Sequence, residues 1–225
     1  MSFSESDKTR ILRLKSSIAS YYNLQMKKIG DRVLESLFYD NCVISGGCIS
    51  SIFHDEPVQD IDLYAKNTKG LHIVKDYIIN SNKNIKAVES YELDENGVKV
   101  NTGSSYTLVT QNAVTLTNDV QFIYMDTWDN CKKKFDFVHC TPHYDLSTQK
   151  LYISESQFNA IKEKKLMPTG KVEIKQKRLE KYQKRGWGLY DIELKAVEYN
   201  WADGVPGLPG IMAQDIAKLI PTAVI

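Results

Sequence analysis

Apolar and polar positions along the chain follow two different periods, and the change between them separates a helical start from a strand-forming middle. Over residues 5–39 apolar side chains recur at helical spacing, which predicts helical structure in which Gly30 either marks a break or only weakens one long helix. Residues 42–45 then form a short apolar run of the kind found in buried strands, and residues 58–65 alternate like a second strand. Residues 48–54, between these strands, are predicted to form one or two helical turns.

The rest of the chain continues this mixture of strands and helices. The predicted elements are a helix at 71–80, strands at 85–93, 106–110, 113–117 and 120–124 with a hairpin turn at 94–97, a short helix at 128–133, a last strand at 135–140, helical segments from 155 to about 200, a loop at 202–210 and an amphipathic helix at 211–220. This order predicts an α/β (α+β) protein in three parts. They are N-terminal helices (1–39), a head with a small mixed β-sheet (40–150) and a C-terminal helical region (151–225).

Composition places the chain among soluble globular proteins. Of its 225 residues, 42% are hydrophobic and 25% are charged, and the formal net charge of +1 excludes a uniformly basic nucleic-acid coat protein. No apolar stretch reaches the roughly 18 residues of a membrane span, and the first residues lack the apolar centre of a signal peptide. Four cysteines without a CxxC pair indicate a reducing compartment, so we expect a cytoplasmic protein with no membrane partner.

The near-neutral charge hides a strong local asymmetry. Residues 162–185 contain ten basic side chains and three acidic ones, so this segment carries +7 and the remainder −6. A concentrated basic strip on an acidic body favours a bound polyanion or nucleotide phosphate, although a solvated helix face would have the same composition.

The candidate chemistry lies in two glycines followed by two carboxylates. Gly46 and Gly47 end a strand at the start of a helix, where backbone N–H groups can approach a phosphate closely. Asp60 and Asp62 stand two apart on the next strand, so their side chains share one face. Such a pair is costly unless a cation lies between the carboxylates, and Mg²⁺ or Mn²⁺ suits these oxygens. Two such ions could support displacement at a phosphate.

Residues 44–48 and 60–63 together resemble the signature of the polymerase-beta-type nucleotidyltransferase superfamily. Three later segments, 120–123, 135–145 and 178–187, are similar to those of small viral and phage-type members. The resemblance implies transfer of a nucleoside monophosphate from ATP or another nucleoside triphosphate to an acceptor, with two divalent metal ions and release of pyrophosphate. It also implies a nucleotidyltransferase head, and a host-cytoplasm location if the source is viral.

The resemblance assigns roles to individual residues. Asp60 and Asp62 would ligate metal, and the superfamily requires a third carboxylate from a neighbouring strand. Asp136 is the preferred candidate because residues 135–138 repeat the apolar–acid–apolar pattern, and it would accept the proton of the attacking hydroxyl. Asp119, just before the strand at 120–124, is the competitor.

The nucleotide-binding residues come from both ends of the proposed site. Gly46 and Gly47 would hold the β- and γ-phosphates, with the Ser45 hydroxyl as a further contact. A helical face would hold the triphosphate, with the tyrosine stacking on a base; its residues, at i, i+3, i+4 and i+7, are Arg178, Lys181, Tyr182 and Arg185. An ordinary basic surface helix with its tyrosine packed inward is the open alternative.

Two other functions remain open. The acceptor could be an RNA or tRNA-like 3′ hydroxyl, or a protein hydroxyl, since nothing in the sequence distinguishes them. Alternatively, the chain could be a non-catalytic nucleotide-binding or structural component of a larger assembly. The apolar tail at 208–225, whose only charged residues are Asp215 and Lys218, is suited to docking a partner or a second copy.

Overall fold

In the computed structural model, which describes residues 3–93, 99–189, 196–197 and 210–211, the N-terminal apolar stripe forms two helices. Helix α1 is Glu5–Ile29 and helix α2 is Arg32–Asn41. Of the two alternatives that the sequence left open, the structure has the break at Gly30, because its φ of +72° is a left-handed helix-ending conformation that glycine adopts without strain. The next residue, Asp31, begins α2 by accepting a hydrogen bond from the Leu34 N–H.

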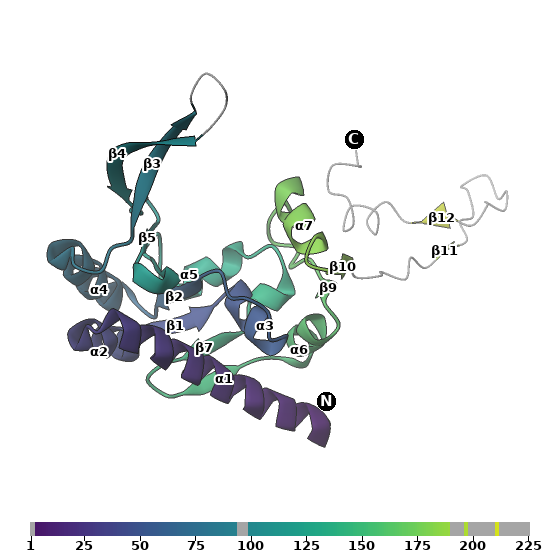
Figure 1. The fold of residues 1–225 in the computed structure, drawn as a ribbon. Helices are drawn as coiled ribbons and strands as arrows, with labels where there is room; N and C mark the ends of the chain where they lie inside the picture. Colours follow the sequence, from purple (N-terminus) through teal and green to yellow (C-terminus); the bar gives the residue numbers. More distant parts are fainter. Residues whose placement is uncertain (1–2, 94–98, 190–195, 198–209, 212–225) are drawn as a thin grey trace.

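A six-stranded mixed sheet forms the centre of the fold, which confirms the predicted α/β class (Figure 1). Its order is β5-β6-β2-β1-β7-β8; β2 and β6 are parallel, and the other neighbours are antiparallel. The strands are β1 (Cys42–Ser45), β2 (Ile61–Ala65), β5 (Ala113–Thr115), β6 (Val120–Ile123), β7 (His143–Asp145) and β8 (Lys150–Tyr152). The pattern predicted the first four, and it missed β7 and β8.

The remaining elements surround this sheet. The helices are α3 (Gly47–Phe53), α4 (Thr68–Ser81), α5 (Trp128–Cys131), α6 (Glu155–Lys162) and α7 (Gln176–Gln183), with single 3-10 turns η1 (Thr117–Asp119), η2 (Lys132–Lys134) and η3 (Val138–Cys140). Short pairs of strands are β3 (Ala87–Leu93) with β4 (Lys99–Thr107), β9 (Lys165–Leu166) with β10 (Gly188–Leu189), and β11 (Ala196–Val197) with β12 (Gly210–Ile211). The predicted hairpin turn at 94–97, the loop at 202–209 and the helix from residue 212 onward lie outside the described residues.

One prediction of secondary structure is wrong. Residues 135–140 are not a strand: Asp136 lies in a bend, Phe137 forms a single bridge with Pro168, and η3 follows. The helical segments predicted from residue 155 correspond to α6 and α7, with β9 and a loop between them. Phe137 and Cys140 of the first segment and Leu166 of β9 serve a small second core.

Three groups of buried side chains hold the described chain together. The largest packs α1, α2 and α4 against the sheet, with Phe38, Leu63 and Phe122 fully buried among its members. A third, smallest group is Val43, Tyr64, Trp128 and Cys131. The second, called the small core below, consists of Phe137, Cys140, Leu166, Tyr182 and Trp187. This second core fixes α7 beyond the end of the sheet where β1 runs into α3 (Figure 1).

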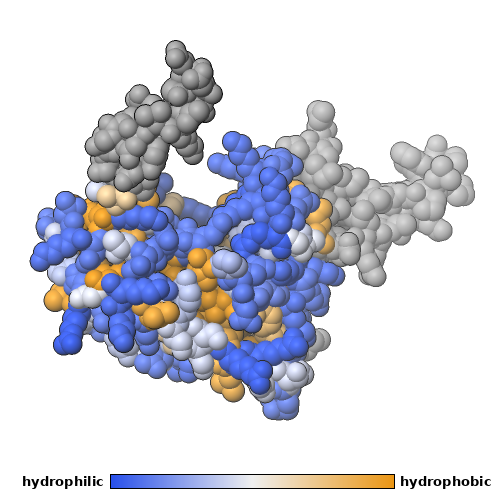
Figure 2. Space-filling model, viewed as in Figure 1, coloured by the Kyte–Doolittle hydropathy of each residue, from blue (hydrophilic) through white to orange (hydrophobic). Residues whose placement is uncertain are grey.

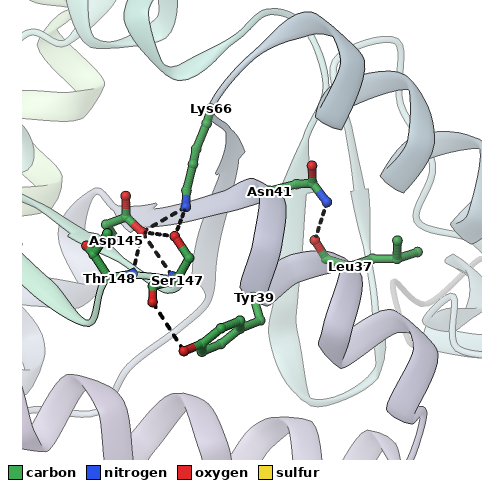
Figure 3. Close-up of polar contacts among 7 residues, drawn as sticks. All are labelled: Leu37, Tyr39, Asn41, Lys66, Asp145, Ser147 and Thr148. Atoms are coloured by element: carbon green, nitrogen blue, oxygen red, sulfur yellow. Dashed lines mark hydrogen bonds and ion pairs between the residues drawn. The ribbon is translucent and has the colours of Figure 1, made fainter.

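A polar cluster ties β2 to β7 at the opposite end of these strands (Figure 3). The Lys66 ammonium lies 2.8 Å from a carboxylate oxygen of Asp145 and also donates to the Ser147 hydroxyl. The Tyr39 hydroxyl of α2 donates to the Ser147 carbonyl at 3.2 Å.

All four cysteines are buried free thiols. No helix among the residues described is both long enough and apolar enough to cross a membrane.

Candidate functional site

The turn between β1 and α3 is so tight that its first glycine admits no side chain. Gly46 has a φ of +94°, and a Cβ built on it would lie 2.7 Å from Oδ2 of Asp62. The preceding Ser45 is fully buried, and its hydroxyl lies 2.7 Å from the Pro142 carbonyl and 3.1 Å from the Cys140 carbonyl. The Asp62 carboxylate therefore packs against the glycine backbone, whereas Ser45 supports the turn from inside the fold.

Asp60 and Asp62 face the same cavity at the start of β2, as their spacing predicted. Burial raises the pKa of Asp62 to about 7, and the nearby Asp60 charge adds to this, while Arg178 and Lys181 oppose it. A cation placed beside the Asp62 side chain would stabilise its charged form. The two oxygen-donor side chains are thus suited to a hard divalent ion.

The cavity has a volume of about 360 Å³, within the range of small-molecule sites. Its walls differ in chemistry. Asp60, Asp62, the Gly46–Gly47 turn and cationic side chains of the α7 region make up its polar lining. Its apolar end is lined by Tyr64, Ile123, Met125, Cys131 and Phe135, all of which except Met125 belong to one packed cluster.

The strand next to β2 does not place a third carboxylate in this cavity. Parallel pairing sets Gln121 of β6 opposite Asp62, and Gln121 lines the cavity. Its side-chain nitrogen donates to the Thr115 hydroxyl at 3.1 Å. At the position opposite Asp62, β6 thus contributes an amide to the cavity rather than an acid.

Neither acid proposed from the sequence as the third carboxylate lines the cavity. Asp136 is buried, and it forms a short ion pair with Arg178. Asp119 pairs with Lys86 and lines a separate polar cavity that also contains Asp60. Within the described part of the chain, the metal-type cluster is therefore limited to two carboxylates.

The basic face of α7 does reach the cavity. Arg178, Lys181 and Arg185 all line it, and the surface over α7 is hydrophilic (Figure 2). Tyr182 also borders it but is only 3% exposed, and its ring packs edge-on against His139 and Trp187. The base-stacking role suggested by the sequence therefore has no open ring face to support it.

Sequence reasoning missed several residues that shape the site. Glu56, from the loop before β2, contacts both Arg185 and Lys164. Gln121 and Ile123 belong to a strand that was predicted correctly, yet their place at the cavity depends on the register of β6 with β2. Only the pairing of β2 with β6, which lie far apart in sequence, could have revealed these two residues there.

Comparison with protein families matches residues 15–164 to the family described as "Gabija anti-defense 2 family protein". The matched region is about two thirds of the chain. This chain belongs to the Gabija anti-defense 2 family. The match contains the β1–α3 turn, Asp60, Asp62 and Gln121, and it ends before α7. No curated protein matches the chain.

Similar solved structures are CCA-adding enzymes and a tRNA nucleotidyltransferase. The Bacillus stearothermophilus CCA-adding enzyme in complex with CTP is 13% identical with a TM-score of 0.39, covering 66% of this chain and 36% of that one. For the Thermotoga maritima enzyme complexed with tRNA the values are 13%, 0.37, 60% and 31%. For a tRNA nucleotidyltransferase with a primer tRNA and an ATP analogue they are 12%, 0.34, 56% and 34%. This Gabija anti-defense 2 family chain spans about a third of their length, and a likeness this slight transfers no activity.

Proposed function

We propose that this chain is a metal-dependent nucleotidyltransferase. One observation carries the proposal: Asp60 and Asp62 share a cavity with the Gly46–Gly47 turn and with three cationic side chains of the α7 region, Arg178, Lys181 and Arg185. A magnesium–nucleoside triphosphate complex requires carboxylates beside cationic side chains. The metal ion binds to the carboxylates, and the phosphates bind to the arginine and lysine side chains.

The residues present fit a divalent ion. Asp60 and Asp62 would hold it, with the Gln121 side chain beside them. Burial is the main cause of the raised pKa of Asp62, so a cation bound beside this carboxylate would offset the cost of its charge. When bound, the ion would supply charge neutralisation at the phosphates and polarise the reacting oxygens.

The side chains of the protein bind and orient the substrate. Arg178, Lys181 and Arg185 would hold the β- and γ-phosphates, and the apolar end of the cavity would receive the base and ribose. The acceptor oxygen forms a bond to the α-phosphorus, the bond to the bridging oxygen breaks, and pyrophosphate leaves with the electron pair. The hydroxyl proton is released to water.

The family description suggests the biological setting. We infer that the transferase reaction acts against the Gabija defence, with an RNA 3′ hydroxyl or a protein hydroxyl as the acceptor. A viral or phage source remains a prediction of the sequence resemblance.

Gln121 favours a second candidate function. An amide opposite Asp62 reduces the negative charge available for a second metal ion, as expected of a protein that binds nucleotide without transferring it. Such a protein would act by sequestering or sensing a nucleotide.

Calorimetry of ATP, GTP, CTP and UTP with Mg²⁺ tests the proposal, using wild type and the Asp60→Asn/Asp62→Asn double variant. Binding of at least one triphosphate, weakened tenfold or more in the double variant, is expected. Asp76→Asn is the matched control, since Asp76 is exposed on α4 and does not line the cavity. If no triphosphate binds, or if the double variant binds equally well, the proposal is wrong. Binding without pyrophosphate release from any RNA or protein acceptor would favour the second candidate.

A further inference from the structure

Each of the two arginines that line the cavity forms an ion pair with a carboxylate that does not line it. Nε of Arg178 donates to Asp136 in a short charge-assisted hydrogen bond. The Asp136 side chain is only 10% exposed, and its second oxygen accepts the N–H of Phe137 at 2.9 Å. Because that bond and the surrounding core fix Asp136, it gives the guanidinium of Arg178 a defined orientation.

Arg185 is anchored in the same way on the other side of α7's inner face. One of its terminal nitrogens donates to the Glu56 carboxylate at 2.7 Å and to the Ser51 hydroxyl at 2.8 Å. The other oxygen of Glu56 pairs with Lys164. Glu56 therefore sits between two cations, and one of them lines the cavity.

The ring of Tyr182 keeps the two guanidinium groups apart. Their central carbons lie 5.5 Å (Arg178) and 6.0 Å (Arg185) from its centroid, and its hydroxyl lies 3.1 Å from the Cys140 sulfur. Lys181, between the two arginines in sequence, is exposed and has no ion pair within the described ranges. The cavity thus has two oriented guanidinium groups and two ammonium groups, that of Lys181 and that of Lys134, which lies 3.9 Å from an Asp126 carboxylate oxygen.

An arginine fork carries five N–H groups, so an arginine that gives one edge to a carboxylate still offers another to a ligand. Asp136 lies outside the cavity with its carboxylate directed at Arg178, an arrangement that serves the arginine rather than a metal ion. We propose that Asp136 and Glu56 are positioning residues that hold Arg178 and Arg185 for the terminal phosphates of the triphosphate. This inference rests on the proposed nucleotide site and assigns Asp136 a different role from the sequence prediction.

The test compares triphosphate, monophosphate and metal binding in the same variants. Asp136→Asn and Glu56→Gln keep the side-chain shape and remove the charge. We measure binding of ATP, GTP, CTP and UTP and of their monophosphates by calorimetry with Mg²⁺, and binding of Mn²⁺ alone by electron paramagnetic resonance. Each variant should bind the triphosphate about tenfold more weakly, while the affinities for the monophosphate and for Mn²⁺ change less than twofold.

The matched control is Asp145→Asn, which also removes the acid of a partly buried ion pair but lies outside the cavity. It should leave all three affinities within twofold of wild type. A second measurement repeats Asp136→Asn in an Arg178→Gln background. If Asp136 acts through Arg178, the added change in triphosphate affinity should be less than twofold there.

Several outcomes would overturn the inference. Loss of Mn²⁺ binding in Asp136→Asn would make Asp136 a metal ligand, as the sequence suggested. If Asp136→Asn weakened triphosphate and monophosphate binding equally, Asp136 would only support the general structure of the protein. An undiminished effect of Asp136→Asn in the Arg178→Gln background would mean the same. Wild-type binding that the two variants leave unchanged refutes only the positioning role. Absence of triphosphate binding in wild type refutes the proposed function, and the positioning role with it.

Discussion

Asp62 is the residue at which the requirements of stability and of the proposed chemistry conflict. Its pKa rises from the ordinary 3.8 to about 7 through burial and the Asp60 charge. The unfolded chain therefore releases this proton at a lower pH than the folded one, and the folded protein loses stability as the pH rises from about 4 to about 7. Without metal, Asp62→Asn should be more stable than wild type at pH 8, by about 4 kcal/mol.

Urea unfolding in a chelating buffer measures this effect. The difference between Asp62→Asn and wild type should disappear near pH 4, where both side chains are neutral, and shrink at pH 8 when Mg²⁺ is added to wild type. Equal stability of the two proteins at pH 8 would contradict the argument.

The same residues show what a sequence can predict. Gly46 and the Asp60–Asp62 pair could be predicted because each belongs to a short local sequence pattern. Gly46 ends a strand where only glycine fits, and the two acids lie on one face of the next strand. Asp136 has an equally clear local pattern between two phenylalanines, yet its environment is set by Arg178, which is 42 residues away. No local pattern contains that contact, so the prediction of a strand acid was wrong about the strand.

At the scale of elements, the attachment of β7 to β2 depends on one ion pair. Asp145 is partly buried, which raises its pKa, but the Lys66 ammonium and the N–H and hydroxyl groups of residues 147–148 lower it more, so the net pKa is below its ordinary value (Figure 3). The ion pair therefore stabilises the fold above about pH 4 and loses its contribution as the pH falls through the lowered pKa. Asp145→Asn should lower the free energy of unfolding by about 1–3 kcal/mol at pH 7.

Denaturant unfolding at pH 7 and pH 3 checks this expectation. The cost of Asp145→Asn should be present at pH 7 and much smaller at pH 3. Lys66→Met should show the same pH dependence, since it removes the other half of the pair. An equal cost at both pH values would mean that shape rather than charge fixes β7.

Element prediction succeeded where one period ran long enough and failed where chain segments serve a distant core. The helices at 5–29 and 32–41 follow from a sustained apolar stripe and a glycine break. The three-residue strands β7 and β8 show no alternation in the sequence, whereas β5, equally short, lies within a longer alternating run at 113–117. β7 and β8 exist as strands because they extend the sheet beyond β1. Likewise Phe137 alternates as in a strand but packs beside Trp187 in the second core.

At the scale of the whole molecule, the candidate site lies between two cores of unequal size. The Gly46 turn and both cavity carboxylates belong to elements packed on the large core, whereas α7 depends on the small one. The family match covers the Gly46 turn and both carboxylates, and it ends before α7. The strength of triphosphate binding should therefore depend on how firmly the small core holds α7 in place.

Trp187→Ala tests this dependence. Trp187 is 2% exposed, and its ring centroid lies 4.0 Å from that of His139, so its removal should cost about 3–5 kcal/mol of local packing. The loss falls on a core that includes few other large side chains, so α7 and β9 should open without unfolding the sheet. Hydrogen exchange should accelerate in residues 165–189 and stay slow in β1 and β2, while triphosphate affinity falls and Mn²⁺ affinity does not.

Phe38→Ala, in the large core, should instead accelerate exchange throughout the sheet. If Trp187→Ala speeds exchange equally in β1, β2 and α7, the two cores unfold as one unit, and the helix that carries the cavity arginines has no independent stability.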